Sequence, residues 1–450
     1  MKAKMFVTPL LAAAALCTSL TALAGGVADS PAGNPVTRWN AVAIQVLPVD
    51  PGLVMDSRAF AIVHAAIHDA VNGVERRYQP YTIELSYPSA SVDAAIATAA
   101  RDTLVALSPS QSTTVEIAYA ATLLGIPDGA AKQAGIELGH RSAEANLARR
   151  VGDGADTAGG PPYVPNGEPG DYDFTSPFDK PPFGPVALFP GWGNVTPFGV
   201  EALDHRLPGP LALTSRDYAR DFKLLKSIGR NDSSVRTAQQ TDLAMFWFEF
   251  SPMGWNRIAN TLLRQERTDV WRSARIMALV NFALADGYIT GFAEKYRHRF
   301  WRPTTAIRAA DRDGNPATDA DKNWTPLQAP AFFTPPVPDY PSTHTVLGAA
   351  AAEVLIQNFG DRMRFDVVST TLPGAARTFQ SLSDAAHENG MSRVYGGIHF
   401  LHAVKEGCRQ GKSVGRVVSQ LLAPARDGKA AQNNGAGPVK SKLCVHGLTP

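Results

Sequence analysis

Apolar residues recur along most of this chain at the spacing of a helix rather than a strand. In the segment 56–78 they follow one another at intervals of three or four residues, which is the spacing of one helix face. These residues are Phe60, Val63, Ile67, Val71 and Val74. Similar patterns predict helices at about 91–107, 127–150, 215–229, 234–249, 267–300, 343–360, 375–390 and 397–422. Alternating β-branched segments are hard to find, so a mainly α-helical fold is predicted.

Two stretches rich in glycine and proline interrupt the helical pattern. The first, at about 153–210, also carries several aromatic residues, which favours ordered packing over a free linker. The second, at about 309–341, ends in TPPVPDYPSTH. We expect four parts: a targeting segment at 1–24, an N-terminal helical half at 25–210, a C-terminal helical half at 211–424 and a polar tail at 425–450.

The first 24 residues have the order of a secretory signal peptide. Two lysines precede an apolar run from Met5 to Leu16, and Ala22-Leu23-Ala24 offers a cleavage site. The run is too short to span a bilayer, and no other segment is expected to be apolar for long enough. The mature protein is therefore expected to begin near Gly25 and to be exported, either to the periplasm or out of the cell.

Composition and cysteine content bear on the binding partners and on a possible disulfide. The chain has 43 Lys and Arg against 41 Asp and Glu, a net charge of +2, so no broad basic surface for nucleic acid is expected. Without the leader, Cys408 and Cys444 remain. In an exported chain they can form a disulfide that pins the tail to the last helix, but their pairing is left open. A homo-oligomer is equally possible.

Positive charge is concentrated in KYRHRFWRP, residues 295–303. On one helix that ends at Pro303, Lys295 and Arg302 would point nearly the same way, because they are seven residues apart. They would then face a common anion. Arg297 and Arg299 are expected to be solvated or paired elsewhere.

Two later segments offer complementary groups. In PSTH, residues 341–344, Ser342 is placed to cap a new helix, whose free N–H groups attract an anion. In SRVYGGIH, Arg393 and His399 flank a glycine pair. Together with Lys295 and Arg302, these are groups that can hold a tetrahedral oxyanion and act on it.

In this order, K-x6-RP, PSTH and SR-x5-H resemble the motifs of the superfamily of type 2 phosphatidic acid phosphatases and vanadium haloperoxidases. Further segments resemble the bacterial vanadium-dependent haloperoxidases: AFAIVHAAIHDAVNGVERRYQPY, LFPGWG, KYRHRFWRPTTAIRAADRDGNPAT and SRVYGGIHF. The resemblance covers most of the chain after residue 24. It implies the helical-bundle architecture of that family.

The resemblance also implies a role for each candidate residue. The implied oxyanion ligands are Lys295, Arg302, Ser342, the backbone N–H of Thr343 and Arg393. His399 would bond the central atom, which is the vanadium of vanadate in a peroxidase, and His344 would be the acid–base group. Hydrogen peroxide and a halide would be the substrates, with Lys295 polarising the peroxide.

Three positions depart from the family pattern. Thr343 stands where glycine is usual, so a side chain borders the anion. Ala403 stands where the fuller motif SR-x5-H-x3-D has an aspartate that orients the histidine, so His399 is expected to lack that partner. Val337 stands where haloperoxidases tend to carry Phe or His. These departures weigh more against halide oxidation than against oxyanion binding.

Two other functions therefore stay open. An acid phosphatase acting on phosphomonoesters would carry the phosphoryl group on His399 and would need no cofactor. An inactive protein would bind the oxyanion without turnover. Two weaker signals are set aside: GCRQGKS, 407–413, lacks the P-loop spacing, and His64 with His68 lacks a third metal ligand and is expected in the core.

Overall fold

The computed structural model describes residues 33–49, 53–158, 160–327, 332–425, 439 and 441–444. The predicted signal peptide and most of the predicted tail lie outside these residues. Within them the chain forms thirteen α-helices and one two-stranded antiparallel sheet. The prediction of a mainly α-helical fold is confirmed.

Most of the predicted helical segments are present in the structure, but several helices and the strands were not predicted. Eight predicted segments correspond to helices α2 (Leu53–Val74), α3 (Val92–Leu107), α5 (Ala130–Arg149), α6 (Arg216–Ile228), α7 (Ala238–Phe246), α9 (Val270–His298), α11 (Thr343–Phe359) and α13 (Leu401–Val418). The helix predicted at 375–390 is wrong in its first part, which is strand β2 (Ala376–Phe379), paired with β1 (Phe365–Val368) and followed by α12 (Leu382–Tyr395). The helices that were not predicted are α1 (Pro35–Val46), α4 (Ser112–Leu124), α8 (Ser251–Gln265) and α10 (Pro303–Arg308).

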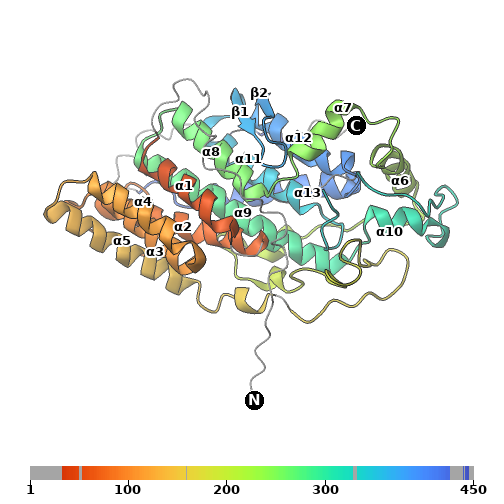
Figure 1. Ribbon diagram of the computed structural model, residues 1–450, viewed down its shortest axis with the longest axis horizontal. Helices are drawn as coiled ribbons and strands as arrows, with labels where there is room; N and C mark the ends of the chain where they lie inside the picture. The colour runs from red at the N-terminus through yellow and green to blue at the C-terminus, as the bar shows by residue number, and fades with distance from the viewer. Residues whose placement is uncertain are drawn as a thin grey trace, which may run out of the picture.

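Helix α9 is the central element of the fold. It contacts α2, α11 and α13, with α2 to α5 gathered at one end of the molecule and α6 and α10 at the other (Figure 1). Among the described helices it alone is long and apolar enough to cross a membrane by length and composition, which the sequence analysis did not foresee. Because 94% of its most apolar window is buried inside the protein, we assign it to the core.

Helix α13 lies directly against α11, because three glycines of α13 face that helix. They recur every four residues, so they share one helix face, and a Cβ atom at any of them would overlap a backbone oxygen of α11. The glycines are Gly407, Gly411 and Gly415, and the oxygens belong to Ser342, Val346 and Ala350. The glycines of the P-loop-like segment thus serve helix packing, and they hold the start of α11 against α13.

The first Gly/Pro-rich stretch packs over the end of α9, as its aromatic residues predicted. The Tyr172 backbone N–H donates to the Arg299 carbonyl over 2.6 Å, and the Trp301 N–H donates to the Gly170 carbonyl over 2.9 Å. The ring of Tyr163 lies against that of Tyr172, with centroids 5.4 Å apart. This stretch therefore supports the turn that follows α9.

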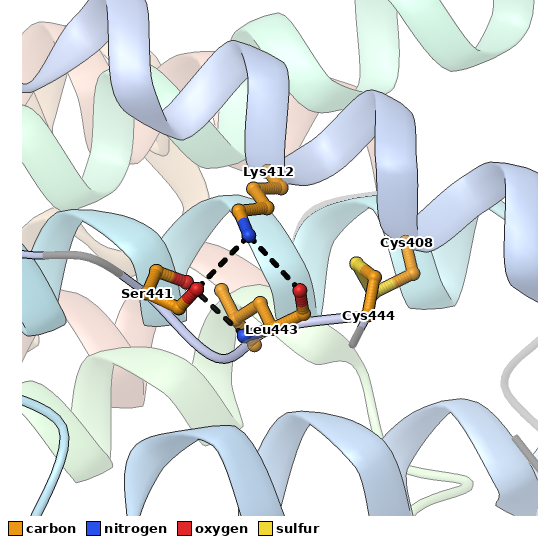
Figure 2. The surroundings of a disulfide bond; sticks show 5 residues. All are labelled: Cys408, Lys412, Ser441, Leu443 and Cys444. Carbon is orange, nitrogen blue, oxygen red and sulfur yellow. Dashed lines mark hydrogen bonds between the residues drawn. A yellow bond between two sulfur atoms is a disulfide. The ribbon is translucent and has the colours of Figure 1, made fainter. Parts of the chain in front are cut away.

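A disulfide between Cys408 and Cys444 joins the tail to α13 (Figure 2). Beside it, Lys412 Nζ donates to the carbonyl oxygens of Ser441 over 3.1 Å and Leu443 over 3.0 Å. The pairing that the sequence left open is present in the structure.

Removing this disulfide should lower the free energy of unfolding by about 2–4 kcal/mol, because the bond joins cysteines 36 residues apart and limits the entropy of the unfolded chain. Urea unfolding of the variant Cys408→Ser/Cys444→Ser measures the change. The control variant Lys412→Met keeps the disulfide and should show a smaller loss. Equal unfolding free energies for the disulfide-free variant and the parent would contradict the prediction.

Thr343, at the start of α11, packs on a glycine of α9. A Cβ atom built on Gly291 would lie 2.6 Å from the Thr343 Cγ2 methyl, which is closer than two carbon atoms tolerate. The threonine that replaces the motif glycine thus fits because residue 291 of α9 is a glycine and leaves room for its methyl group.

Gly291→Ala should therefore destabilise the protein by about 1–3 kcal/mol through overpacking. In the background Thr343→Gly the same substitution should cost little, so the two changes should be strongly non-additive. Gly287→Ala is the matched control, since its nearest neighbour would be 3.5 Å away, and it should be neutral or stabilising. Thermal or urea unfolding of the four-member cycle gives the coupling energy, and additive effects would exclude the proposed contact.

Candidate active site

Lys295 and Arg302 reach the same site from two different helices. The prediction of one helix running through both is wrong: α9 ends at His298, and Arg299 adopts the left-handed conformation, with φ of 52°. Pro303 does not end a helix but begins α10, with Arg302 at its N-cap position, because proline suits the first turn of a helix. Both side chains are nonetheless completely buried.

The loop 335–339 surrounds these two cations with carbonyl oxygens. Lys295 Nζ donates to Pro338 over 2.5 Å and to Asp339 over 3.1 Å, and Arg302 donates to Val337 over 2.7 Å, Pro335 over 3.1 Å and, outside the loop, Ile398 over 2.7 Å. Carbonyl groups orient the cations but carry no net charge. The positive charge of the site is therefore only partly balanced by the protein.

The two other cations of the cluster point elsewhere, as expected. Arg297 pairs with Glu294 one turn earlier on α9, and Arg299 pairs with Asp171 of the Gly/Pro-rich stretch over 2.8 Å. Of the four cations in KYRHRFWRP, two thus lie in the candidate site and the other two form ion pairs outside it.

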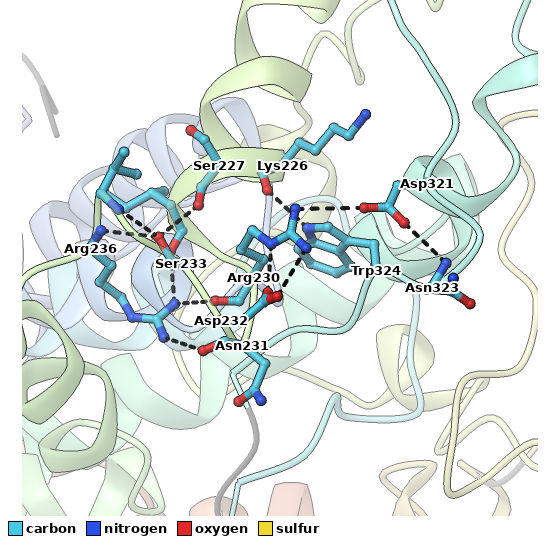
Figure 3. A network of polar contacts seen from close by, with 12 residues as sticks. Lys226, Ser227, Arg230, Asn231, Asp232, Ser233, Arg236, Asp321, Asn323 and Trp324 are labelled. Carbon is cyan, nitrogen blue, oxygen red and sulfur yellow. Dashed lines mark hydrogen bonds and ion pairs between the residues drawn. The ribbon is translucent and has the colours of Figure 1, made fainter.

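A tight turn between α12 and α13 brings Arg393 and His399 together. Gly397 has φ of 74°, and a Cβ atom there would overlap the backbone of Gly229, so glycine is required on both counts. Arg236 supports the turn by donating to the Tyr395 carbonyl over 3.2 Å. Figure 3 shows Arg236 in the polar network that orders the chain after α6. Gly397, the second glycine of the motif pair, is therefore a structural requirement.

His399 is buried among charged groups. Its Nε2 lies 3.0 Å and its Nδ1 3.4 Å from Arg302 Nη1, and its Nδ1 lies 2.9 Å from Asp339 Oδ1. No carboxylate stands at Ala403, so the motif partner of His399 is absent as expected, but the carboxylate of Asp339 lies beside the ring instead. Asp339 was missed, although it stands only three residues before Ser342 in PDYPSTH.

Ser342 occupies the N-cap position of α11. The prediction that its side chain caps the helix is wrong, because the side chain makes no capping hydrogen bond. Its hydroxyl oxygen accepts a hydrogen bond from Thr345 Oγ1 over 3.0 Å, and its backbone N–H donates to the Ala403 carbonyl over 3.0 Å. The hydroxyl hydrogen of Ser342 thus remains available to an anion at the helix N-terminus. Thr343, the first residue of α11, retains a backbone N–H for the same purpose.

His344 lies on the same helix turn and contacts a residue that the sequence did not single out. Its Nδ1 is 2.8 Å from Ser251 Oγ at the start of α8. Burial, reinforced by the positive charge of Arg393, lowers the pKa of His344 well below its usual value. His344 is therefore neutral near pH 7 and able to accept a proton.

Burial dominates the electrostatics of this cluster. It lowers the pKa of Lys295 well below its usual value and that of Arg393 to about 9, in both cases helped by Arg302. It raises the pKa of Asp339 to about 7, against the opposing effects of Arg302, Lys295 and the Phe400 backbone N–H. Three buried cations face one buried carboxylate, an arrangement that a multiply charged anion would stabilise.

The donor set fits a tetrahedral oxyanion. Arg393 is only 3% exposed, its Nε has no hydrogen-bond partner among the described residues, and its Nη1 donates to the Trp247 carbonyl over 3.3 Å. A guanidinium in such surroundings needs an acceptor. Vanadate and phosphate both supply acceptor oxygens and negative charge, so the residues present suit either group.

The remaining candidates lie in the core. His64 and His68 are buried, with Nε2 atoms 2.9 Å from Asn40 Oδ1 and 3.0 Å from the Gln79 carbonyl. In the part of the chain that the structure describes, no group of three or more His, Cys, Asp or Glu side chains could hold a metal ion. Val337 is also buried, and an effect of this residue on halide choice stays a prediction.

Comparison with known proteins finds similarity to vanadium chloroperoxidases. Residues 275–428 match the family model of the VCPO second helical-bundle domain. The chain is similar to a vanadium chloroperoxidase of Curvularia inaequalis, with 27% identity over 278 residues that span 47% of this chain and 45% of that protein.

Solved structures show the same fold. A bacterial vanadium-dependent iodoperoxidase has a TM-score of 0.72 and 23% identity, covering 87% of this chain and 95% of its own. A bacterial vanadium-dependent chloroperoxidase in its apo form has a TM-score of 0.66 and 17% identity, covering 82% and 93%. Residues 275–428 therefore match the VCPO second helical-bundle domain, and the chain as a whole has the fold of these vanadium-dependent peroxidases.

Proposed function

We propose that this protein is a vanadium-dependent haloperoxidase, which binds vanadate and uses hydrogen peroxide to oxidise a halide. The observation that carries the proposal is the buried cluster of Lys295, Arg302 and Arg393, whose charge is only partly balanced by the carboxylate of Asp339. The family of its relatives supports vanadate as the oxyanion.

In this proposal the three cations hold the oxygen atoms of the anion. Arg393 has the most unused donor capacity, since only one of its hydrogen bonds goes to a protein carbonyl in the described structure. Ser342 Oγ and the Thr343 backbone N–H add donors at the N-terminus of α11, where the helix dipole also favours negative charge. Lys295, anchored by two carbonyl oxygens, keeps its ammonium group directed at the site.

The two histidines would serve opposite sides of the anion. His399 would offer an imidazole nitrogen to its central atom, and His344 would accept and return a proton while Ser251 holds its ring. Vanadate, when bound, would supply the activation of hydrogen peroxide toward halide attack. Exclusion of water follows from the burial of His399, Arg302 and Lys295.

We also propose that the protein is exported. The signal-like order of residues 1–24 supports this, and the disulfide fits an oxidising compartment such as the periplasm or the exterior.

An acid phosphatase acting on phosphomonoesters is the second candidate. It is favoured by one observation: each donor in the cluster fits phosphate as well as vanadate, because the two anions share shape and charge. His399 would then be the nucleophile and His344 the proton donor to the leaving alcohol. Since the relatives found are haloperoxidases, peroxide chemistry remains the leading proposal.

The deciding experiment compares bromination of a phenol dye by hydrogen peroxide and bromide with and without orthovanadate, alongside p-nitrophenyl phosphate hydrolysis by the vanadate-free protein. A haloperoxidase should brominate only with vanadate. Phosphate release that vanadate inhibits, with no bromination, would establish the phosphatase instead. Binding of vanadate with neither activity would identify an inactive oxyanion-binding protein.

His399→Ala should lower vanadate-dependent turnover about 100-fold or more, because it removes the group expected to bond the central atom. Arg297→Ala, the matched control from the same cationic segment, should stay within about twofold, since Arg297 pairs with Glu294 rather than with a site residue and its side chain is 38% exposed. Steady-state rates at saturating vanadate measure both. Similar losses in the two variants would show that the site has been assigned to the wrong residues.

A further inference from the structure

We propose that Asp339 is the residue that positions His399, in place of the motif aspartate that Ala403 has replaced. The inference rests on the proposed function only in that His399 is taken to bond the oxyanion. It assigns to this chain a positioning carboxylate that comes from the loop before α11 rather than from α13.

Asp339 has the required location and burial. It is 0% exposed, and its Oδ1 lies 2.9 Å from His399 Nδ1 and 3.9 Å from Arg302 Nη1. Neither of its carboxylate oxygens completes a hydrogen bond of good geometry within the described residues. A carboxylate is costly to bury without a partner, and the imidazole N–H of His399 is a donor at the right distance.

Arg302 Nη1 lies closer to Nε2 of the ring, at 3.0 Å, than to Nδ1, at 3.4 Å, and this favours one position for the proton. A guanidinium has only donors, so the Nε2 of His399, 3.0 Å from Arg302 Nη1, must act as an acceptor. The proton of the neutral ring is then on Nδ1, facing Asp339. When an oxyanion binds, Arg302 would donate to its oxygen atoms instead, and the Nε2 lone pair would then be free for the central atom, which is the tautomer that a ligand or nucleophile needs.

The backbone holds Asp339 in register with the other site residues. Its N–H donates to the Phe300 carbonyl over 2.8 Å, and its carbonyl oxygen accepts from Lys295 Nζ over 3.1 Å. The carboxylate is therefore attached to the same frame as Lys295 and Arg302. A shift of the loop would move the lysine, the arginine and the histidine partner together.

The space next to Ala403 shows why the substitution is tolerated. Asp339, Ala403 and His402 line the same cavity of about 10 Å³, which is room for roughly one water molecule. Asp221 also lines it, but its oxygens accept the backbone N–H groups of Leu401 and His402 over 2.9 Å and 2.7 Å. Asp221 thus caps α13, and Asp339 is the carboxylate left for His399.

The experiment moves the carboxylate back to the motif position. Asp339→Ala and the double variant Asp339→Ala/Ala403→Asp are compared with the parent as full-length proteins. Two quantities are measured: the affinity for orthovanadate by calorimetry, and the tautomer of His399 by ¹⁵N NMR of the histidine side chains in vanadate-free protein. Asp286→Asn is the matched control, because Asp286 is equally buried but accepts the backbone N–H groups of Phe198 and Gly199.

Asp339→Ala should weaken vanadate binding about 10–100-fold and should shift His399 away from the Nδ1–H tautomer. The double variant should recover both properties, which a purely structural role for Asp339 would not predict. Asp286→Asn should alter stability without changing the His399 tautomer. If Asp339→Ala does not fold, Asp339→Asn keeps the side-chain shape and should show the same two changes.

An unchanged tautomer in the Asp339 variants would overturn the inference, even if vanadate binding weakened, since the loss would then come from charge alone. A parent protein that binds no vanadate would contradict the proposed function instead. The tautomer measurement would still decide the role of Asp339, so the two failures can be told apart.

Discussion

Burial of three cationic side chains at one point in an apolar helical bundle is the constraint on which this structure depends. Lys295, Arg302 and Arg393 are at most 3% exposed, and burial of such groups is costly unless opposite charge and hydrogen-bond acceptors surround them. The protein supplies carbonyl oxygens and one carboxylate, Asp339. A bound anion would supply the remaining balance, which supports the oxyanion site proposed above.

The helical frame exists to bring these groups to one point from distant segments. Lys295 comes from the last turn of α9, Arg302 from the start of α10, and Arg393 from the last turn of α12. Close packing is needed to hold such ends in place, and the glycines of α13 permit it by letting α11 and α13 meet backbone to backbone. Precision at the site is therefore set by helix packing as much as by the charged residues.

The residues around Thr343 and Ala403 explain how the structure accommodates these two departures from the family motif. The methyl group of Thr343 occupies space above Gly291 of α9, so the replacement of glycine is matched by a glycine elsewhere. The carboxylate absent at Ala403 has a proposed counterpart in Asp339, whose Oδ1 lies 2.9 Å from His399 Nδ1. In both cases a loss at one motif position is offset by a residue that is remote along the chain but adjacent in space.

Local pattern in the sequence was enough to determine the mainly helical fold and the ranges of the long helices, because apolar periodicity depends only on neighbours along the chain. The order of the three motifs also predicted the candidate residues of the site, which lie at helix ends or, for His399, in the turn before α13. The end of α9 at His298, the hairpin of β1 and β2 and the pairing of Cys408 with Cys444 were decided by tertiary contacts. The same holds for the partner of His399: Asp339 is 60 residues away in sequence, and only the folded backbone brings its carboxylate within 2.9 Å of the ring.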